Sequence, residues 1–218
     1  MLSPLLRACL FDMDGTIVDS TPVGNRAWGR WADEAGIVDR TFMETFHGRP
    51  GLEVLAEILP ADQIDTAFAR LVDLEANDVE GVEAIAGAEA LLSSLDDTQR
   101  AIVTSSQPSI VPVRLAAAGL DRPSIVVTAD QTARGKPHPD PFLRGASLLG
   151  VAPGECAVFE DTPPGIEAAR AAGVAFVVGV RGTHPDAALQ GADVIVDDLS
   201  AVRVEPAAEG AFRLVVSA

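Results

Sequence analysis

Apolar residues after residue 84 fall into short runs separated by longer segments with helical spacing. The β-rich runs span 101–104, 125–128, 157–159, 175–180 and 194–196, and the helical segments between them span 88–95, 111–118, 141–149 and 165–172. Strands that alternate with helices predict right-handed βαβ units and a parallel sheet covered on both faces. Another apolar run, 5–11, precedes Asp12, so we expect an α/β fold with a doubly wound core.

Residues 18–83 depart from this alternation. No convincing strand pattern lies there, and amphipathic helical patterns occur instead at about 23–35, 52–59 and 64–77. We therefore expect a core formed by 1–17 and 84–218, with a helical lobe, 18–83, inserted after the first strand.

The C-terminal residues predict a β-hairpin. Two apolar, β-rich segments, 202–205 and 212–216, flank the turn-forming residues 206–210. We interpret the hairpin as an extension of the sheet edge that carries no chemistry.

Composition and charge narrow the function classes. The chain has 218 residues, of which 48% are hydrophobic and 22% charged, as in ordinary globular proteins. Its formal net charge of −16 opposes binding to a nucleic acid, because such binding usually requires a basic surface. The helical lobe is strongly acidic, which mildly favours a monomer.

The N-terminal apolar run is too short to cross a membrane. It is interrupted by Arg7, ends at Asp12 and lacks a signal-peptide cleavage pattern. We therefore expect a cytoplasmic protein with no membrane partner. Cys9 and Cys156 lie within predicted strands, so we expect two buried free thiols.

Polar residues follow the predicted strands, where ligands bind in open parallel sheets. The strand ends carry these groups in chain order: Asp12 and Asp14, then Thr104-Ser105-Ser106, then Lys136, then Glu160-Asp161. Carboxylate oxygens in this number suit Mg²⁺, and the hydroxyls and neighbouring amides suit phosphate oxygens.

These residue types together indicate phosphoryl transfer. An aspartate can attack phosphorus to form an aspartyl-phosphate, and a second carboxylate can protonate the leaving oxygen and then activate water. Lys136, the only lysine in the sequence, would neutralise the attacking carboxylate and the transferring group. A compact ammonium rather than a planar guanidinium suits this place.

The sequence resembles the haloacid dehalogenase superfamily, in its Mg²⁺-dependent phosphatase and phosphomutase branch. The motifs that carry the resemblance are DMDGT at 12–16, TSS at 104–106, Lys136 and EDTPPG at 160–165. The resemblance implies that Asp12 is the nucleophile, Asp14 the general acid/base and Lys136 a further catalytic residue. It also implies phosphate binding by Thr104, Ser105 and Lys136, and metal binding by Asp12, Asp14, Glu160 and Asp161.

The helical lobe is similar in position to the small cap of this superfamily, which closes over the site. Within the β-phosphoglucomutase-like branch, the segments 46–49 and 135–141 look most like those of phosphatases acting on small sugar and polyol phosphates, such as hexitol phosphate, 2-deoxyglucose-6-phosphate and glycerol phosphate. His47 and Arg49 are the candidate substrate contacts of the lobe. A surface ion pair is the alternative role for Arg49, and an ordinary helix terminus that for His47.

Four alternative functions differ from this one in the residues that they require. A sugar phosphomutase of the β-phosphoglucomutase type shares the chemistry, but its cap carries a histidine where this sequence has Gly24. A dehalogenase would need neither Asp14 nor a metal, and a phosphonatase would need a lysine in the lobe. A phosphate sensor without catalysis is the last alternative, although every expected catalytic residue is present.

Overall fold

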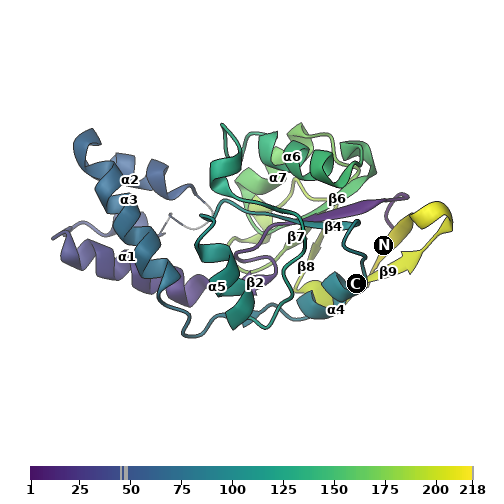
Figure 1. Ribbon diagram of the computed structural model, residues 1–218, viewed down its shortest axis with the longest axis horizontal. Helices are drawn as coiled ribbons and strands as arrows, with labels where there is room; N and C mark the ends of the chain where they lie inside the picture. Colours follow the sequence, from purple (N-terminus) through teal and green to yellow (C-terminus); the bar gives the residue numbers. More distant parts are fainter. Residues whose placement is uncertain (45, 47–48, 218) are drawn as a thin grey trace.

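The computed structural model describes residues 1–44, 46 and 49–217. Its centre is a six-stranded parallel sheet with the order β5-β4-β1-β6-β7-β8 (Figure 1). The strands are β1 (Ala8–Phe11), β4 (Arg100–Val103), β5 (Val126–Val127), β6 (Cys156–Glu160), β7 (Phe176–Val180) and β8 (Val194–Val196). The chain extends the sheet first to one side of β1 and then to the other, so the predicted doubly wound α/β core is confirmed.

Helices cover both faces of the sheet. Apolar residues of α4 (Ala88–Ser93) and α5 (Ile110–Ala117) pack on one face, and those of α6 (Asp140–Leu149) and α7 (Pro163–Ala171) on the other. Successive residues of β1 alternate between these two clusters, with Phe11 on the first face and Leu10 on the second. Both faces of the strand are therefore buried, which explains its continuous apolar run.

A helical lobe lies beside the sheet (Figure 1) and contains α1 (Thr21–Glu34), α2 (Gly51–Ile58) and α3 (Ala61–Ala76). Trp28 and Trp31 are both buried, with ring centroids 5.7 Å apart in an edge-to-face arrangement. Phe42 and Phe46 also contact Trp28. This aromatic cluster gives the lobe its own hydrophobic core.

Two short strands connect the lobe to the sheet domain. β2 (Val18–Asp19) pairs antiparallel with β3 (Glu83–Ala84) where the chain enters and leaves the lobe. The expectation that 18–83 contains no strand is wrong here, because two-residue strands are too short to produce an alternating pattern. The expected boundary at 17/18 lies directly before β2, and that at 83/84 lies between the two residues of β3.

The C-terminal hairpin forms as predicted from β9 (Val202–Pro206) and β10 (Phe212–Val216). It is a separate two-stranded sheet rather than an extension of the main sheet edge. Leu2 and Leu6 pair with β10 through isolated bridges, and Phe212 packs into the core. The hairpin therefore anchors the N-terminal segment.

Short 3₁₀ turns complete the fold: η1 (Thr41–Glu44), η2 (Ala129–Gln131), η3 (Pro153–Glu155), η4 (Asp186–Ala188), η5 (Leu199–Ala201) and η6 (Ala208–Gly210). None of the helices in the described part of the chain is long and apolar enough to span a membrane. Cys9 and Cys156 are buried free thiols, as expected.

Candidate active site

The carboxyl ends of β1, β4 and β6 bring the predicted residues together. Asp12 directly follows β1, and its amide donates to the Phe159 carbonyl (3.0 Å) on the neighbouring β6. Glu160 is the last residue of β6, and Thr104 directly follows β4. The opening between β1 and β6, where the strand order reverses direction, is where such sheets bind ligands.

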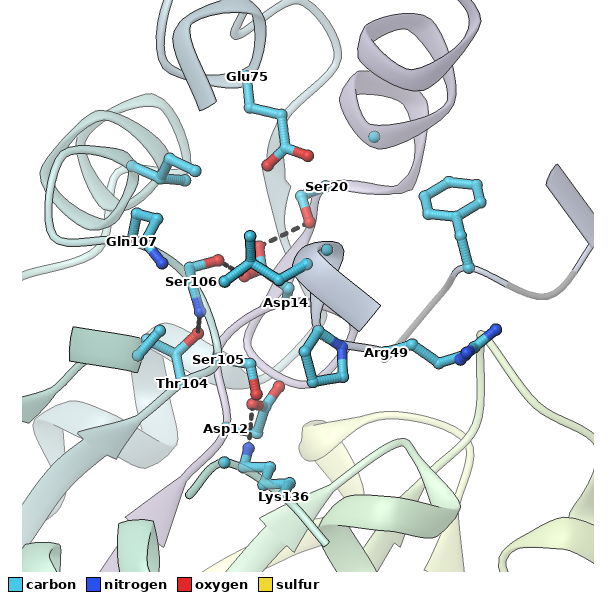
Figure 2. Close-up of a pocket in the computed structure, with 18 of the residues that line it drawn as sticks. Asp12, Asp14, Ser20, Arg49, Glu75, Thr104, Ser105, Ser106, Gln107 and Lys136 are labelled. Carbon is cyan, nitrogen blue, oxygen red and sulfur yellow. Dashed lines mark hydrogen bonds and ion pairs between the residues drawn. The ribbon is translucent and has the colours of Figure 1, made fainter. Parts of the chain in front are cut away.

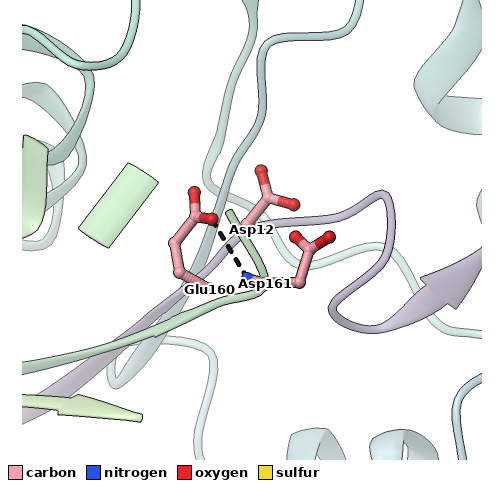
Figure 3. Close-up of side chains that lie close together, drawn as sticks. All are labelled: Asp12, Glu160 and Asp161. Atoms are coloured by element: carbon pink, nitrogen blue, oxygen red, sulfur yellow. Dashed lines mark hydrogen bonds between the residues drawn. The ribbon is translucent and has the colours of Figure 1, made fainter. Parts of the chain in front are cut away.

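Three buried carboxylates form an acidic cluster (Figure 3). Asp12, Glu160 and Asp161 each place one carboxylate oxygen within 4.8 Å of the other two. Asp161 accepts hydrogen bonds from the hydroxyls of Thr16 (3.1 Å) and Thr183. These donors fix Asp161 beside Asp12.

Lys136 lies between two members of the acidic cluster. Its Nζ donates to Asp12 Oδ1 (2.5 Å) and to the Val103 carbonyl (3.0 Å), and it lies 2.6 Å from Glu160 Oε1. The side chain is 4% exposed. Burial acts to lower the pKa of Lys136, but Asp12 and Glu160 outweigh it and raise that pKa, so the amine stays protonated.

A single ammonium does not balance three carboxylates. Burial raises the pKa of Asp12, with Glu160 and Asp161 adding to the rise and Lys136 opposing it. Burial, together with the charge of Glu160, also raises the pKa of Asp161 to about 7. Groups that resist ionisation in this way would gain from a divalent cation, and their oxygen donors are those that Mg²⁺ prefers.

Asp14 lies apart from the acidic cluster. Its carboxylate accepts hydrogen bonds from Ser20 Oγ (2.7 Å), Ser106 Oγ (2.7 Å) and Arg114 Nη1 (2.5 Å). Among the residues that the structure describes, the metal-ligand group contains three carboxylates, and that of Asp14 is not one of them. These three donors hold the side chain toward the helical lobe, and a role for Asp14 as a fourth carboxylate ligand stays a prediction.

The hydroxyl residues after β4 line the same cavity as Asp12 and Lys136. Thr104 is buried and its Oγ1 accepts from the Ser106 amide (3.0 Å), whereas Ser105 is exposed. Figure 2 shows Thr104, Ser105 and Asp12 close together around Lys136. This arrangement places the hydroxyl residues Thr104 and Ser105 near the nucleophile candidate.

The cavity has a volume of about 650 Å³ and lies between the sheet and the lobe. Its floor contains Asp12 and Lys136, and its wall on the lobe side contains the side chains of Trp28, Phe46 and Leu71. Gly24 also lines it, and a Cβ there would lie 3.6 Å from the Phe46 ring. The cavity is thus polar at the floor and mostly apolar above.

Arg49 lies in the cavity wall (Figure 2) and pairs with Glu57, with Nη2 2.5 Å from Oε1. Arg49 therefore forms the ion pair that was its alternative role, and it also lines the cavity. His47, the other candidate substrate contact, lies outside the described residues.

Arg114 and Glu75 are site residues that the sequence analysis missed. Arg114 contacts both Asp14 and Glu75, and only 5% of its side chain is exposed. Burial raises the pKa of Glu75, with Arg114 opposing the rise. The available signal was an arginine in the otherwise apolar helix sequence IVPVRLAA.

Comparison with known proteins agrees with this geometry. The model of a family described as "haloacid dehalogenase-like hydrolase" matches residues 6–173. Hexitol phosphatase A from Escherichia coli (strain K12) is 39% identical, covering 89% of this chain and 92% of its own. Validoxylamine A 7'-phosphate phosphatase from Streptomyces hygroscopicus subsp. limoneus is 34% identical, covering 91% and 97%.

A solved structure shows the same fold. The β-phosphoglucomutase from Clostridium difficile superposes with a TM-score of 0.76 at 26% identity, covering 89% of this chain and 92% of that one. Together with the family match, these similarities confirm the resemblance that the motifs indicated: the chain belongs to the haloacid dehalogenase-like hydrolase family.

Proposed function

We propose that the protein is a phosphatase that hydrolyses small sugar or polyol phosphates through an aspartyl-phosphate on Asp12. The observation that carries this proposal is the placement of Asp12 at the cavity floor, beside Lys136 and two further buried carboxylates. The name of the 39% identical hexitol phosphatase supports the substrate class. The sequences of both phosphatase relatives align with nearly the whole chain.

Mg²⁺ fits the acidic cluster as the metal. Asp12 and Asp161 would hold it, and Glu160 would assist directly or through water, because its Oε2 already accepts from Thr162 Oγ1 and two backbone amides. When bound, the ion would offset the carboxylate charges and draw negative charge from the phosphoryl oxygens.

The first step joins phosphorus to Asp12. Thr104, the Ser105 amide and Lys136 would hold the phosphoryl oxygens while the Asp12 carboxylate attacks phosphorus. Lys136 already binds Oδ1, which leaves Oδ2 to attack. The bond from phosphorus to the ester oxygen breaks, and Asp14 gives that oxygen a proton, so an alcohol leaves.

The second step regenerates the enzyme. The ionised Asp14 takes a proton from a water molecule, and the water oxygen attacks phosphorus. The bond between phosphorus and Asp12 breaks, which releases inorganic phosphate and restores both carboxyl groups. Residues 18–83 would act as the cap over this chemistry, and the core formed by 1–17 and 84–218 would carry it.

Charge at the cavity favours a substrate with one phosphate. The cations among the described lining residues are Arg49, Arg114 and Lys136, and each already pairs with a carboxylate. Glu53 and Glu75 add negative charge to the lobe side. A second phosphate would meet no free cation among the described residues of the cavity, which also argues against a mutase that depends on a sugar bisphosphate.

Phosphate release by the purified protein tests the proposal. The panel contains hexose, hexitol, glycerol and glycolate phosphates, each with Mg²⁺ and with chelator, and Asp12→Asn is the matched control. We expect Mg²⁺-dependent release that favours hexose or polyol phosphates and is abolished in the variant. A chain that releases no phosphate but converts β-glucose-1-phosphate to the 6-phosphate would be a mutase. One that binds phosphate without turnover would be a sensor.

A further inference from the structure

Arg114 joins the lobe to the proposed acid/base. It belongs to α5, which packs against α3 of the lobe. Its Nη1 donates to Asp14 Oδ1 (2.5 Å), and its Nη2 donates to Glu75 Oε2 (2.7 Å) on α3. One guanidinium thus holds a carboxylate from each side of the cavity.

The guanidinium of Arg114 is buried, so its charge has to be balanced by neighbouring carboxylates. The Arg114 side chain is 5% exposed, and those of Glu75 and Asp14 are 15% and 26% exposed. An unpaired charge at this depth is costly, so the guanidinium of Arg114 needs its carboxylate partners. Moving α3 away from α5 would therefore disturb the arrangement around Asp14.

Ser20 supplies a second connection between Asp14 and the lobe. It directly precedes α1, the position from which a serine commonly caps a helix, but it makes no capping hydrogen bond. Its hydroxyl donates to Asp14 Oδ1 instead (2.7 Å). Figure 2 shows Glu75 and Ser20 on the lobe side of Asp14, with both side chains directed toward that part of the cavity.

We propose that Arg114 is a positioning residue that couples the orientation of the Asp14 carboxylate to the position of the helical lobe through Glu75. This inference rests on the proposed function, in which Asp14 protonates the leaving oxygen. Arg114 sets the acid/base in place while the lobe is docked, and it contributes little to binding of the phosphate.

The two separate nitrogens of Arg114 are essential to this role. Nη1 donates to Asp14 and Nη2 donates to Glu75. A lysine has one nitrogen on a flexible stem and cannot reproduce this planar pair of donors. We therefore expect Arg114→Lys to recover part of the activity that Arg114→Met loses. Glu75→Gln should weaken the interaction of Arg114 with α3 of the lobe while the ion pair between Arg114 and Asp14 remains.

A comparison of leaving groups distinguishes positioning from a general structural role. The kcat/KM values report steps through formation of the aspartyl-phosphate. An alkyl phosphate needs a proton on its leaving oxygen, whereas p-nitrophenyl phosphate releases a stable anion. We expect Arg114→Met to lower kcat/KM by about 10–10²-fold for the best alkyl phosphate, within the range of general acid catalysis and misplacement. The loss should be severalfold at most for p-nitrophenyl phosphate.

The matched control is Arg70→Met, which removes another arginine with two carboxylate partners, Glu34 and Asp73, inside the lobe. It should leave both kcat/KM values near those of the wild type. Combining Arg114→Met with Asp14→Asn should add little to the loss from Asp14→Asn alone, because both changes act on one proton transfer. Equal losses for the two substrates, or fully additive effects, would overturn the inference.

Hydrogen exchange tests the coupling without activity. Arg114→Met should increase amide exchange at the C-terminal end of α3, while the strands of the central sheet keep their protection. Unchanged exchange in α3 would refute the coupling, even in an active enzyme. If the wild type releases no phosphate from any substrate, the proposed function fails, and increased exchange in α3 would still support the link between lobe and core.

Discussion

At the scale of single residues, Lys136 has three oxygen contacts that depend on a compact ammonium. Its Nζ contacts Asp12, Glu160 and the Val103 carbonyl, all within 3.0 Å. We expect Lys136→Arg to lower kcat by at least about tenfold despite the retained charge, because the larger planar guanidinium would displace Asp12. Steady-state kinetics and thermal unfolding of the variant measure this, and full activity would refute the argument.

Asp14 provides a second prediction at this scale. Asp14→Asn keeps the size of the side chain but removes proton transfer, so kcat should fall by about 10²–10⁴-fold. The KM for the preferred phosphate ester should change little, because Asp14 lies apart from the residues that would hold the phosphoryl group. Kinetics on both substrate types measure the effect. Unchanged turnover would show that another group moves the proton.

At the scale of elements, α7 begins so close to the end of β6 that its third residue, Gly165, lies directly against the Glu160 carboxylate. A Cβ on Gly165 would lie 1.8 Å from Glu160 Cδ. Gly165→Ala should therefore displace the Glu160 carboxylate, cost about 1–3 kcal/mol of stability and weaken metal binding. Denaturant unfolding and Mg²⁺ titration of the same variant would measure both effects.

Gly29 in α1 is the matched control. It also lies within a helix, but a Cβ there would contact nothing within 4 Å. Gly29→Ala should leave metal binding unchanged and raise the free energy of unfolding by up to about 1 kcal/mol, because alanine favours the helix. If both variants behaved alike, crowding at Glu160 could not be the cause.

The elements also show where sequence reasoning succeeds. Most residues of the six-stranded sheet are buried, so their apolar runs predicted the core and placed the acidic residues at strand ends. The sequence pattern did not predict the β2–β3 ribbon, because each of its strands has only two residues. The orientation of Asp14 depends partly on Ser106 and Arg114, which lie 92 and 100 residues away along the chain, so local spacing could not predict it.

At the scale of the whole molecule, the acidic cluster should make folding stability depend on pH. Burial raises the pKa of Asp161 to about 7 in the folded protein from 3.8 in the unfolded chain, so between these values the folded protein binds more protons than the unfolded chain. Stability from this group is complete below about pH 4 and is lost as pH rises to about 7. Asp12 acts in the same direction, and His184, whose pKa burial lowers, acts in the opposite one.

The test compares unfolding midpoints in chelator from pH 5 to 7.5 for the wild type and Asp161→Asn. Across this range the free energy of unfolding should fall on the order of 2 kcal/mol further in the wild type than in the variant. Each kcal/mol corresponds to a change of about 2–4 °C in Tm for a protein of this size. His184 is present in both proteins, so its contribution cancels. Mg²⁺ should raise the wild-type midpoint more at pH 7.5 than at pH 5, because the ion competes with protons for the carboxylates. Equal pH slopes in the two proteins would show that Asp161 ionises normally and that the acidic cluster does not raise the pKa of this carboxyl group.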